Sequence, residues 1–122
     1  MEILIARVQD RPGPELGVRV LIDRLWPRGV KKEDAAWDHL HPEVSPSNDL
    51  RSWFNHEPAK FALFEKQYLT ELATPKGGAA VERLRAAAGA RPLVLLTATA
   101  DPEHNHALVL RRRLLGEASA PH

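Results

Sequence analysis

The chain has 122 residues, of which 43% are hydrophobic and 27% charged, and its formal net charge is +1. These values are typical of one ordinary globular domain, and they argue against binding nucleic acid by bulk charge. Because there is no cysteine, disulfides and thiolate metal sites are excluded. The apolar start over residues 1–5 is too short for a signal peptide, and no window reaches the length of a membrane span. We therefore expect a cytoplasmic protein without a membrane partner.

Two β-strands are predicted in the first part of the chain. Residues 3–8 are apolar except for Arg7 and include the β-branched Ile3, Ile5 and Val8, and residues 9–17 are rich in the turn formers proline and glycine. A second strand is predicted over residues 18–26, where three successive apolar residues indicate a strand covered on both faces. The link is too short for a helical crossover, so these strands form an antiparallel pair or are not adjacent.

The segment that follows carries weaker signals. We expect a short helix or turn over residues 31–37 and a short extended piece over residues 40–44. Ser45 is the predicted N-cap of the next helix, because Pro46 then occupies its first position, and Ser47 is a competing cap.

Aromatic residues and leucines mark the inner faces of the next two predicted helices, at the three- and four-residue spacing of a helix. These residues are Leu50, Trp53 and Phe54 in the first helix, and Phe61, Phe64, Tyr68 and Leu72 in the second. Gly77 and Gly78 predict a break after the second helix. A third helix is then expected to end at Gly89.

The last third of the chain predicts a buried strand and a final helix. Residues 93–96 are a continuous apolar run, which is typical of a central strand. Asp101 as N-cap and Pro102 at the first position predict the start of the last helix. Its final turn carries three arginines at residues 111–113, where cations suit the helix dipole.

This order of elements predicts an α/β fold. We expect a single small domain over residues 1–116, with a short mostly parallel or mixed sheet flanked by helices, and a disordered tail over residues 117–122. In such sheets ligands bind beyond the carboxyl ends of the strands. Two predicted strands end in polar clusters, at residues 23–28 and 97–106. If these strands are parallel neighbours, the two clusters share one crevice.

The first cluster contains Asp23, Arg24, Trp26 and Arg28. Such groups at the end of a buried strand are costly unless they bind something or one another. They could form an internal ion pair, an anion site with the indole as a stacking wall, or a partner interface rich in tryptophan and arginine. We favour the anion site, because a guanidinium at a strand end lies where ligands approach.

The second cluster contains His104, Asn105 and His106, near the predicted start of the last helix. The dipole there keeps an imidazole neutral, and a neutral imidazole can act as a base, a hydrogen-bond partner or a metal ligand. The simpler interpretation is that one histidine satisfies local backbone groups. Histidines two positions apart point to nearly opposite sides of a helix, so we expect no metal. No nucleotide-binding or metalloprotease motif occurs, and no cofactor is expected.

Several segments together resemble the YeaO-like family, a family of unknown function. They are residues 18–29 with RVLIDRLWPRG, residues 50–58 with LRSWFNHEP, the aromatic helix of residues 61–72, and residues 93–110 with DPEHNHALVL. The resemblance covers nearly the whole chain. It implies a small cytosolic α/β protein with no settled activity, and it adds Arg51 and His56 to the candidate residues. Relatives often carry a tyrosine and a lysine where Thr97 and Ala100 stand here, which puts any chemistry by those groups in doubt.

We therefore predict a small enzyme or binding protein for an anionic, phosphate- or nucleotide-like molecule. His104 is the predicted base or acid, and Asp23 orients either His104 or an arginine. The predicted ligand-binding residues are Arg24, Trp26, Arg28, Arg51, His56, Asn105 and His106. The alternative is a non-enzymatic module for nucleic acid or protein, with a basic stripe from residues 111–113 and the loop of residues 24–28.

Overall fold

A computed structural model describes residues 1–116, so the predicted tail at residues 117–122 lies outside the described residues. One sheet is formed by β1 (Ile3–Arg7), β2 (Val18–Leu21), β3 (His39–Leu40) and β4 (Leu93–Thr97). The strand order is β1-β4-β2-β3, and every neighbouring pair is parallel. The α/β class is thereby confirmed. The first two strands are not adjacent, because β4 lies between them.

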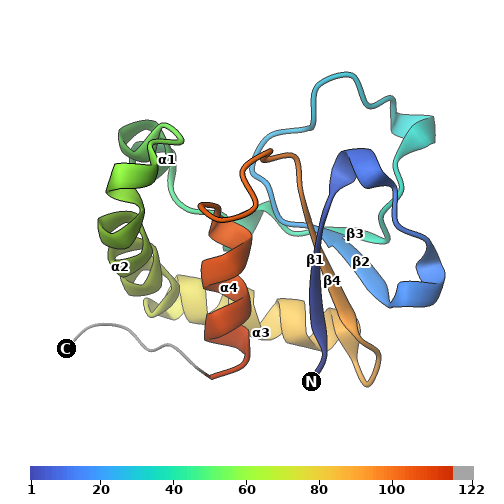
Figure 1. The fold of residues 1–122 in the computed structure, drawn as a ribbon. Helices are drawn as coiled ribbons and strands as arrows, with labels where there is room; N and C mark the ends of the chain where they lie inside the picture. Colours follow the sequence, from blue (N-terminus) through green and yellow to red (C-terminus); the bar gives the residue numbers. More distant parts are fainter. Residues whose placement is uncertain (117–122) are drawn as a thin grey trace.

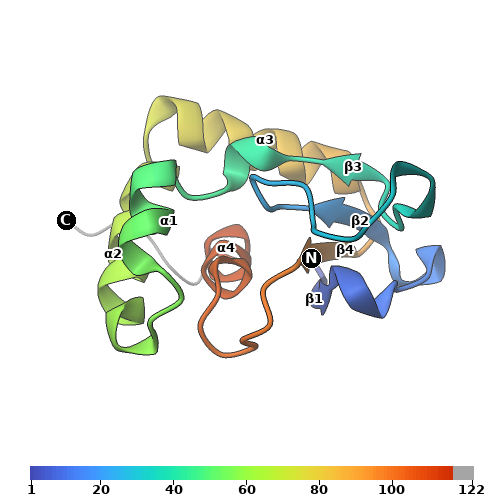
Figure 2. The ribbon, with the colours of Figure 1, turned by 90° about the horizontal axis from the view of Figure 1, so that it is seen from above.

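The helices lie on one side of this sheet (Figure 1). They are α1 (Asn48–Phe54), α2 (Phe61–Leu72), α3 (Pro75–Ala88) and α4 (His106–Leu114). Short 3-10 turns fill the connections at Val8–Asp10, Pro14–Leu16, Lys32–Asp34, Pro42–Val44 and Pro58–Lys60. Seen from above, α4 lies between the sheet and α2 (Figure 2). No helix among residues 1–116 has the length and apolar character needed to cross a membrane.

Alternation along the strands divides the apolar side chains between two clusters. The residues of the sheet side that pack against the helices are Ile3, Val18, Val20, Leu93 and Leu95 from the strands, and Ile22 directly after β2. The opposite face carries Leu21, Val94 and Leu96, which are covered by Val30 and Trp37 from the connection before β3. The domain therefore has two layers, with helices on one face of the sheet and loops on the other.

The start of α1 corrects the predicted N-cap. Ser47 caps the helix, because its Oγ accepts a hydrogen bond from the Leu50 N–H at 3.2 Å. The same hydroxyl donates to Glu71 Oε2 at 2.6 Å. Ser45 Oγ instead donates to the carbonyl of Ile22 at 2.6 Å. The prediction of Ser45 was wrong because a distant carbonyl, beside the end of β2, takes its hydroxyl.

The end of one strand and the buried face of one helix also differ from the predictions. The strand predicted over residues 18–26 ends at Leu21, so the polar cluster after it is loop rather than strand. Trp53 was expected on the inner face of α1, but the residue is 37% exposed and the Lys60 ammonium lies 5.1 Å from its ring centroid. Leu50 and Phe54 form the buried face of α1.

The predicted break after the second helix is present, but it lies at Ala73 and Thr74. Gly77 and Gly78, which were predicted to form it, lie in the first turn of α3. Thr74 caps this turn by accepting a hydrogen bond from the Gly77 N–H at 3.0 Å. A Cβ atom on Gly77 would lie 2.2 Å from the carbonyl oxygen of Glu71. A Cβ atom on Gly78 would meet no closer atom than the Leu72 carbonyl oxygen at 3.9 Å. The close approach of α2 and α3 therefore requires glycine at the first position only.

We expect Gly77→Ala to lower the free energy of unfolding by about 1–3 kcal/mol, because the new methyl group displaces backbone. Gly78→Ala is the matched control, and it should raise the free energy of unfolding by about 0.5–1 kcal/mol through better helix propensity. Urea unfolding of both variants measures the difference. Equal effects of the two substitutions would contradict the close approach.

Candidate functional site

The ends of β2 and β4 bring the two predicted polar clusters together. These strands are parallel neighbours with Leu21 opposite Leu96, so the residues that follow each strand emerge side by side. Asp23 Oδ1 accepts a hydrogen bond from Thr97 Oγ1 at 2.8 Å, and Asp23 Oδ2 accepts one from the Ala98 N–H at 2.8 Å. The prediction that the clusters meet at one crevice is confirmed for these residues.

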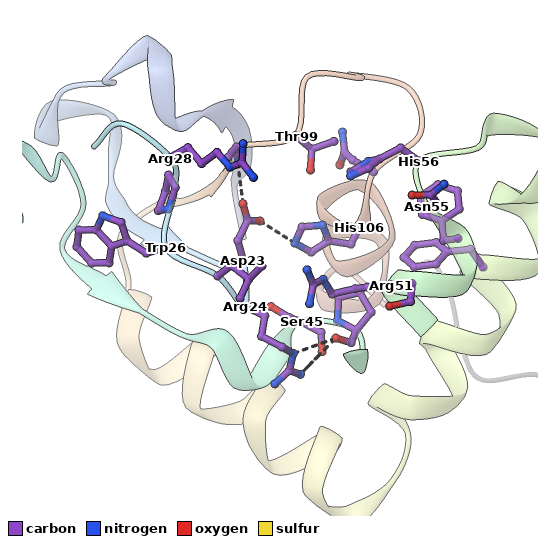
Figure 3. Close-up of a pocket in the computed structure, with 18 residues that line it drawn as sticks. Asp23, Arg24, Trp26, Arg28, Ser45, Arg51, Asn55, His56, Thr99 and His106 are labelled. Atoms are coloured by element: carbon purple, nitrogen blue, oxygen red, sulfur yellow. Dashed lines mark hydrogen bonds and ion pairs between the residues drawn. The ribbon is translucent and has the colours of Figure 1, made fainter. Parts of the chain in front are cut away.

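His106 reaches the same carboxylate from the first position of α4. Its Nε2 lies 3.1 Å from Asp23 Oδ1 and 3.2 Å from the carbonyl oxygen of Ile22. Both neighbours accept hydrogen bonds, so Nε2 carries a proton. Figure 3 shows the two side chains pointing toward each other from opposite sides of the cavity. The pair is largely enclosed, with side-chain exposures of 12% for His106 and 15% for Asp23.

The pKa of the Asp23 carboxyl reflects opposing effects. Burial raises this pKa, whereas the hydrogen bond and the charge of His106, followed by the bonds from Ala98 and Thr97, lower it. The net result is a pKa below the ordinary value of 3.8. Asp23 is therefore an ionised and fully engaged carboxylate at neutral pH.

A cavity of about 530 Å³ opens at this edge of the sheet. Its walls come from the loop after β2, from the segment 45–56 that includes α1, and from the start of α4. The lining includes the cationic or titratable residues Arg24, Arg28, Arg51, His56 and His106, whereas Asp23 is the sole acidic residue among those that line it. The lining as a whole is therefore basic.

Arg28, Arg51 and His56 are three predicted binding residues that line the cavity. Arg51 keeps its position by donating from Nη1 to Asn48 Oδ1 at 2.8 Å. His56 follows the end of α1 with a φ of 56°, and its neighbour Asn55 has a φ of 47°. Two successive non-glycine residues in the left-handed region are strained, and such strain clusters at functional sites.

Arg24 also borders the cavity, but its guanidinium is engaged by the protein. Its Nε and Nη2 donate to the carbonyl of Pro46 at 3.3 and 3.2 Å, and Nη2 donates to the carbonyl of Ser45 at 3.3 Å. Figure 3 shows this side chain turned toward that wall. Arg24 thus ties the loop after β2 to the segment that enters α1.

Trp26 and Asn105 line the cavity in ways that the sequence did not indicate. The indole Nε1 of Trp26 donates to the Val30 carbonyl at 2.7 Å, and the ring packs edge-on against Trp37 at 5.1 Å. Figure 3 shows the indole pointing away from the Asp23–His106 pair, which differs from the expected stacking wall. Asn105 is the N-cap of α4, with its side chain bonded to Leu108 N and to the carbonyl of Asp101.

His104 lies outside the lining of this cavity, and the expected pairing with Asp23 is corrected. Its Nδ1 lies 2.9 Å from Asp101 Oδ2, and its ring meets Phe61 edge-on at 5.5 Å. The reason is the start of α4, which was predicted at Asp101 but lies at His106. Asp101 instead accepts the Glu103 N–H at 2.9 Å in a local turn, so His104 precedes the helix and His106 faces the site.

Sequence reasoning missed two residues that hold the site in place. Thr97 fixes Asp23, and Ser45 fixes the Ile22 carbonyl that His106 also approaches. The signal for both was weak, because a hydroxyl after a strand or before a helix has many local uses. Within residues 1–116, no group of three or more histidine or carboxylate side chains is arranged to hold a metal ion.

Fold and cavity define a small two-layered α/β domain with a basic cavity at the carboxyl edge of a parallel sheet. A family model described as "Inactive DUF488-N3 subclade" matches residues 2–122, and the chain belongs to this family.

Similar proteins confirm the resemblance to YeaO-like proteins. The uncharacterised protein YeaO of Escherichia coli K12 is 44% identical over 110 residues, which cover 90% of this chain and 94% of that protein. Uncharacterised proteins of Mycobacterium bovis (Mb3100c) and Mycobacterium tuberculosis (Rv3073c) are each 37% identical over 114 residues, covering 93% of this chain and 94% of each relative. No solved structure matches the chain.

Proposed function

We propose that the cavity at the ends of β2 and β4 binds a small anionic molecule of phosphate- or nucleotide-like chemistry, and that it does so without converting it. The observation that carries this proposal is the charge of the lining. Three guanidiniums and two imidazoles line the cavity, and the carboxylate of Asp23 is already paired with His106. An anion that enters gains charge-assisted hydrogen bonds without meeting an unpaired carboxylate.

Arg28 and Arg51 are the main anion-binding residues in this proposal. Within residues 1–116, no carboxylate forms an ion pair with either guanidinium. Arg51 uses one nitrogen on Asn48, which leaves other donors of its planar fork for a ligand. Arg24 acts differently, because its bonds to two carbonyls make it a positioning residue for the wall.

The cavity also offers apolar surface for the rest of a ligand. Leu25, which is 63% exposed, lines it beside Pro46, whereas Phe54 and Phe64 contribute little because they are almost fully buried. Its volume lies within the range of about 300–1,000 Å³ that small-molecule sites occupy. A phosphate attached to a flat organic group fits this combination better than inorganic phosphate alone.

Two observations favour binding without turnover. A general base needs a pKa near the operating pH, but the pKa of the Asp23 carboxyl is lowered, and its oxygens already accept hydrogen bonds from Thr97 and Ala98. The matching family is also described as inactive. We keep the cytoplasm as the proposed location, since a chain without cysteine suits a reducing compartment.

A nucleic-acid-binding module remains the second candidate, and the geometry favours it less. The arginines at residues 111–113 lie in the last turn of α4, whereas the loop of residues 24–28 lies beside the first turn of this helix. Arg112 is also paired with Glu65 at 2.6 Å. The basic residues therefore do not form one continuous stripe.

Calorimetric titration with adenosine monophosphate and with uncharged adenosine tests the proposal. We expect the phosphorylated compound to bind and Arg28→Gln to weaken its affinity by about tenfold or more, since a charge-assisted hydrogen bond is lost. Lys76→Gln is the matched control, because it removes one positive charge outside the cavity lining. The nucleotide should be recovered unchanged after incubation. Equal affinities for the two compounds, or equal effects of the two variants, would contradict an anion site.

A further inference from the structure

The carboxyl end of β4 has a second crevice, on the side away from the first cavity. After β4 the chain turns to the helical face and forms α4. After β1 and β2 it turns to the opposite face, where Val8 and Val30 pack in the smaller cluster. In parallel sheets, ligand sites form where neighbouring connections diverge in this way. The fold therefore offers one such point between β4 and β2 and another between β4 and β1.

A cavity of about 430 Å³ lies at this second point. The cavity is lined by Arg7 at the end of β1 and Asp10 after it, by Thr97 at the end of β4 and Thr99 after it, and by Leu108 and Arg111 on α4. Thr99 also lines the first cavity, so the two cavities lie on either side of the segment that joins β4 to α4.

Local structure explains why two arginines line this cavity. Ile3 and Ile5 pack toward the helices, and the alternation of a strand places Arg7 on the same face. On α4, Leu108 and Arg111 are three residues apart and share a face. A long helical side chain leans toward the helix N-terminus, which here is the carboxyl edge of the sheet. Arg7 and Arg111 are thus brought to one crevice by two different elements.

The charge of this crevice is not balanced by the protein. Within the described part of the chain, neither Arg7 nor Arg111 forms an ion pair, whereas Arg19 and Arg112 are paired with Asp38 and Glu65. Asp10 is the sole acidic residue that lines the cavity. Two guanidiniums with one nearby carboxylate leave a net positive crevice that suits an anion.

We propose that this second cavity is a separate binding site for a phosphate group, which Arg7 and Arg111 hold between them. The site is independent of the one proposed at the ends of β2 and β4. It shares a joining segment with that site but neither of its main anion-binding residues. The chain would then carry two phosphate groups, one on each side of β4.

Titration of the full chain with inorganic phosphate, followed by the amide signals of the ¹⁵N-labelled protein, tests the second site. We expect saturable shifts at Arg7, Asp10 and Arg111, with a constant ionic strength maintained by chloride. Arg111→Gln should weaken this affinity by about tenfold or more. Arg113→Gln, which removes the same charge from the same helix outside the cavity lining, should leave it unchanged.

This experiment distinguishes failure of the second-site proposal from failure of the first-site proposal. Shifts confined to residues around Asp23 and Arg28 would overturn the second site and leave the first. Shifts at Arg7 and Arg111 that persist in Arg28→Gln would support the second site whatever the first one does. Linear shifts without saturation, or equal losses in the Arg111 and Arg113 variants, would show a general salt effect and overturn the proposal.

Discussion

Replacement of Asp23 by alanine is expected to lower the free energy of unfolding by about 2–4 kcal/mol. The substitution removes the acceptor of Thr97 Oγ1, of the Ala98 N–H and of His106 Nε2 in one step. These donors come from the end of β4, from the residue after it and from the first position of α4. The substitution therefore weakens the contacts between the sheet and this helix. Urea unfolding at neutral pH measures the loss.

Asp23→Asn separates the charge from the hydrogen bonds. It keeps an acceptor oxygen for one or two of the three donors, so it should cost less than Asp23→Ala. An alanine variant that unfolds like the native chain would show that Asp23 does not hold the two elements together.

The pH dependence of the same variants has a definite sign. Because the pKa of Asp23 is lower in the folded chain than the ordinary 3.8, its ionised form stabilises the fold. This contribution is fully present above the unfolded-state value and is lost as the pH falls through the lower folded-state value. The stability difference between native chain and Asp23→Asn should therefore shrink between about pH 5 and pH 2. Parallel stability curves would contradict the lowered pKa.

Leu95→Ala should be the most damaging truncation in the sheet, with a loss of about 3–5 kcal/mol in the free energy of unfolding. Leu95 lies in the central strand β4 and is fully buried against the helical side. Helices that are packed on several sides cannot collapse into the space that the lost side chain leaves, so the cavity persists.

Leu96→Ala is the matched comparison on the opposite face of the same strand. Leu96 is 1% exposed, yet its cluster is covered by loop residues such as Val30 and Trp37. Loops relax into a void more readily, so we expect a smaller loss of about 2–3 kcal/mol. Thermal or urea unfolding of both variants measures the asymmetry. A greater loss for Leu96 would contradict the assignment of the main core to the helical face.

Continuous patterns in the sequence predicted the fold well. The apolar run of residues 93–96 is the central strand, and the spacing of Phe64, Tyr68 and Leu72 marks the buried face of α2. These signals depend on many residues at once, so no single long-range contact overrides them. The meeting of the two polar clusters was predicted on the condition that β2 and β4 are parallel neighbours, and the structure meets this condition.

Individual helix caps and hydrogen-bond partners were harder to predict, since each one depends on a residue that is distant in the sequence. Local sequence favours Ser45 over Ser47 as the cap, but the Ile22 carbonyl accepts the Ser45 hydroxyl, whereas Ser47 donates to Glu71 and caps the helix. The Asp-Pro pair before α4 mimics a helix start, yet it forms a turn, and this shift replaces His104 by His106 at Asp23. The requirement for Gly77 likewise arises only from the approach of α2 to α3.

Amide chemical-shift mapping with adenosine monophosphate tests most directly whether the crevice between β2 and β4 binds an anion. We predict saturable shifts that centre on Asp23, Arg28, Arg51 and His106, and their loss in Arg28→Gln. Adenosine without phosphate should leave these amides unchanged. Shifts that are absent from these residues would contradict a binding site in this cavity, whereas additional shifts at Arg7 and Arg111 would report the separate phosphate site between β4 and β1.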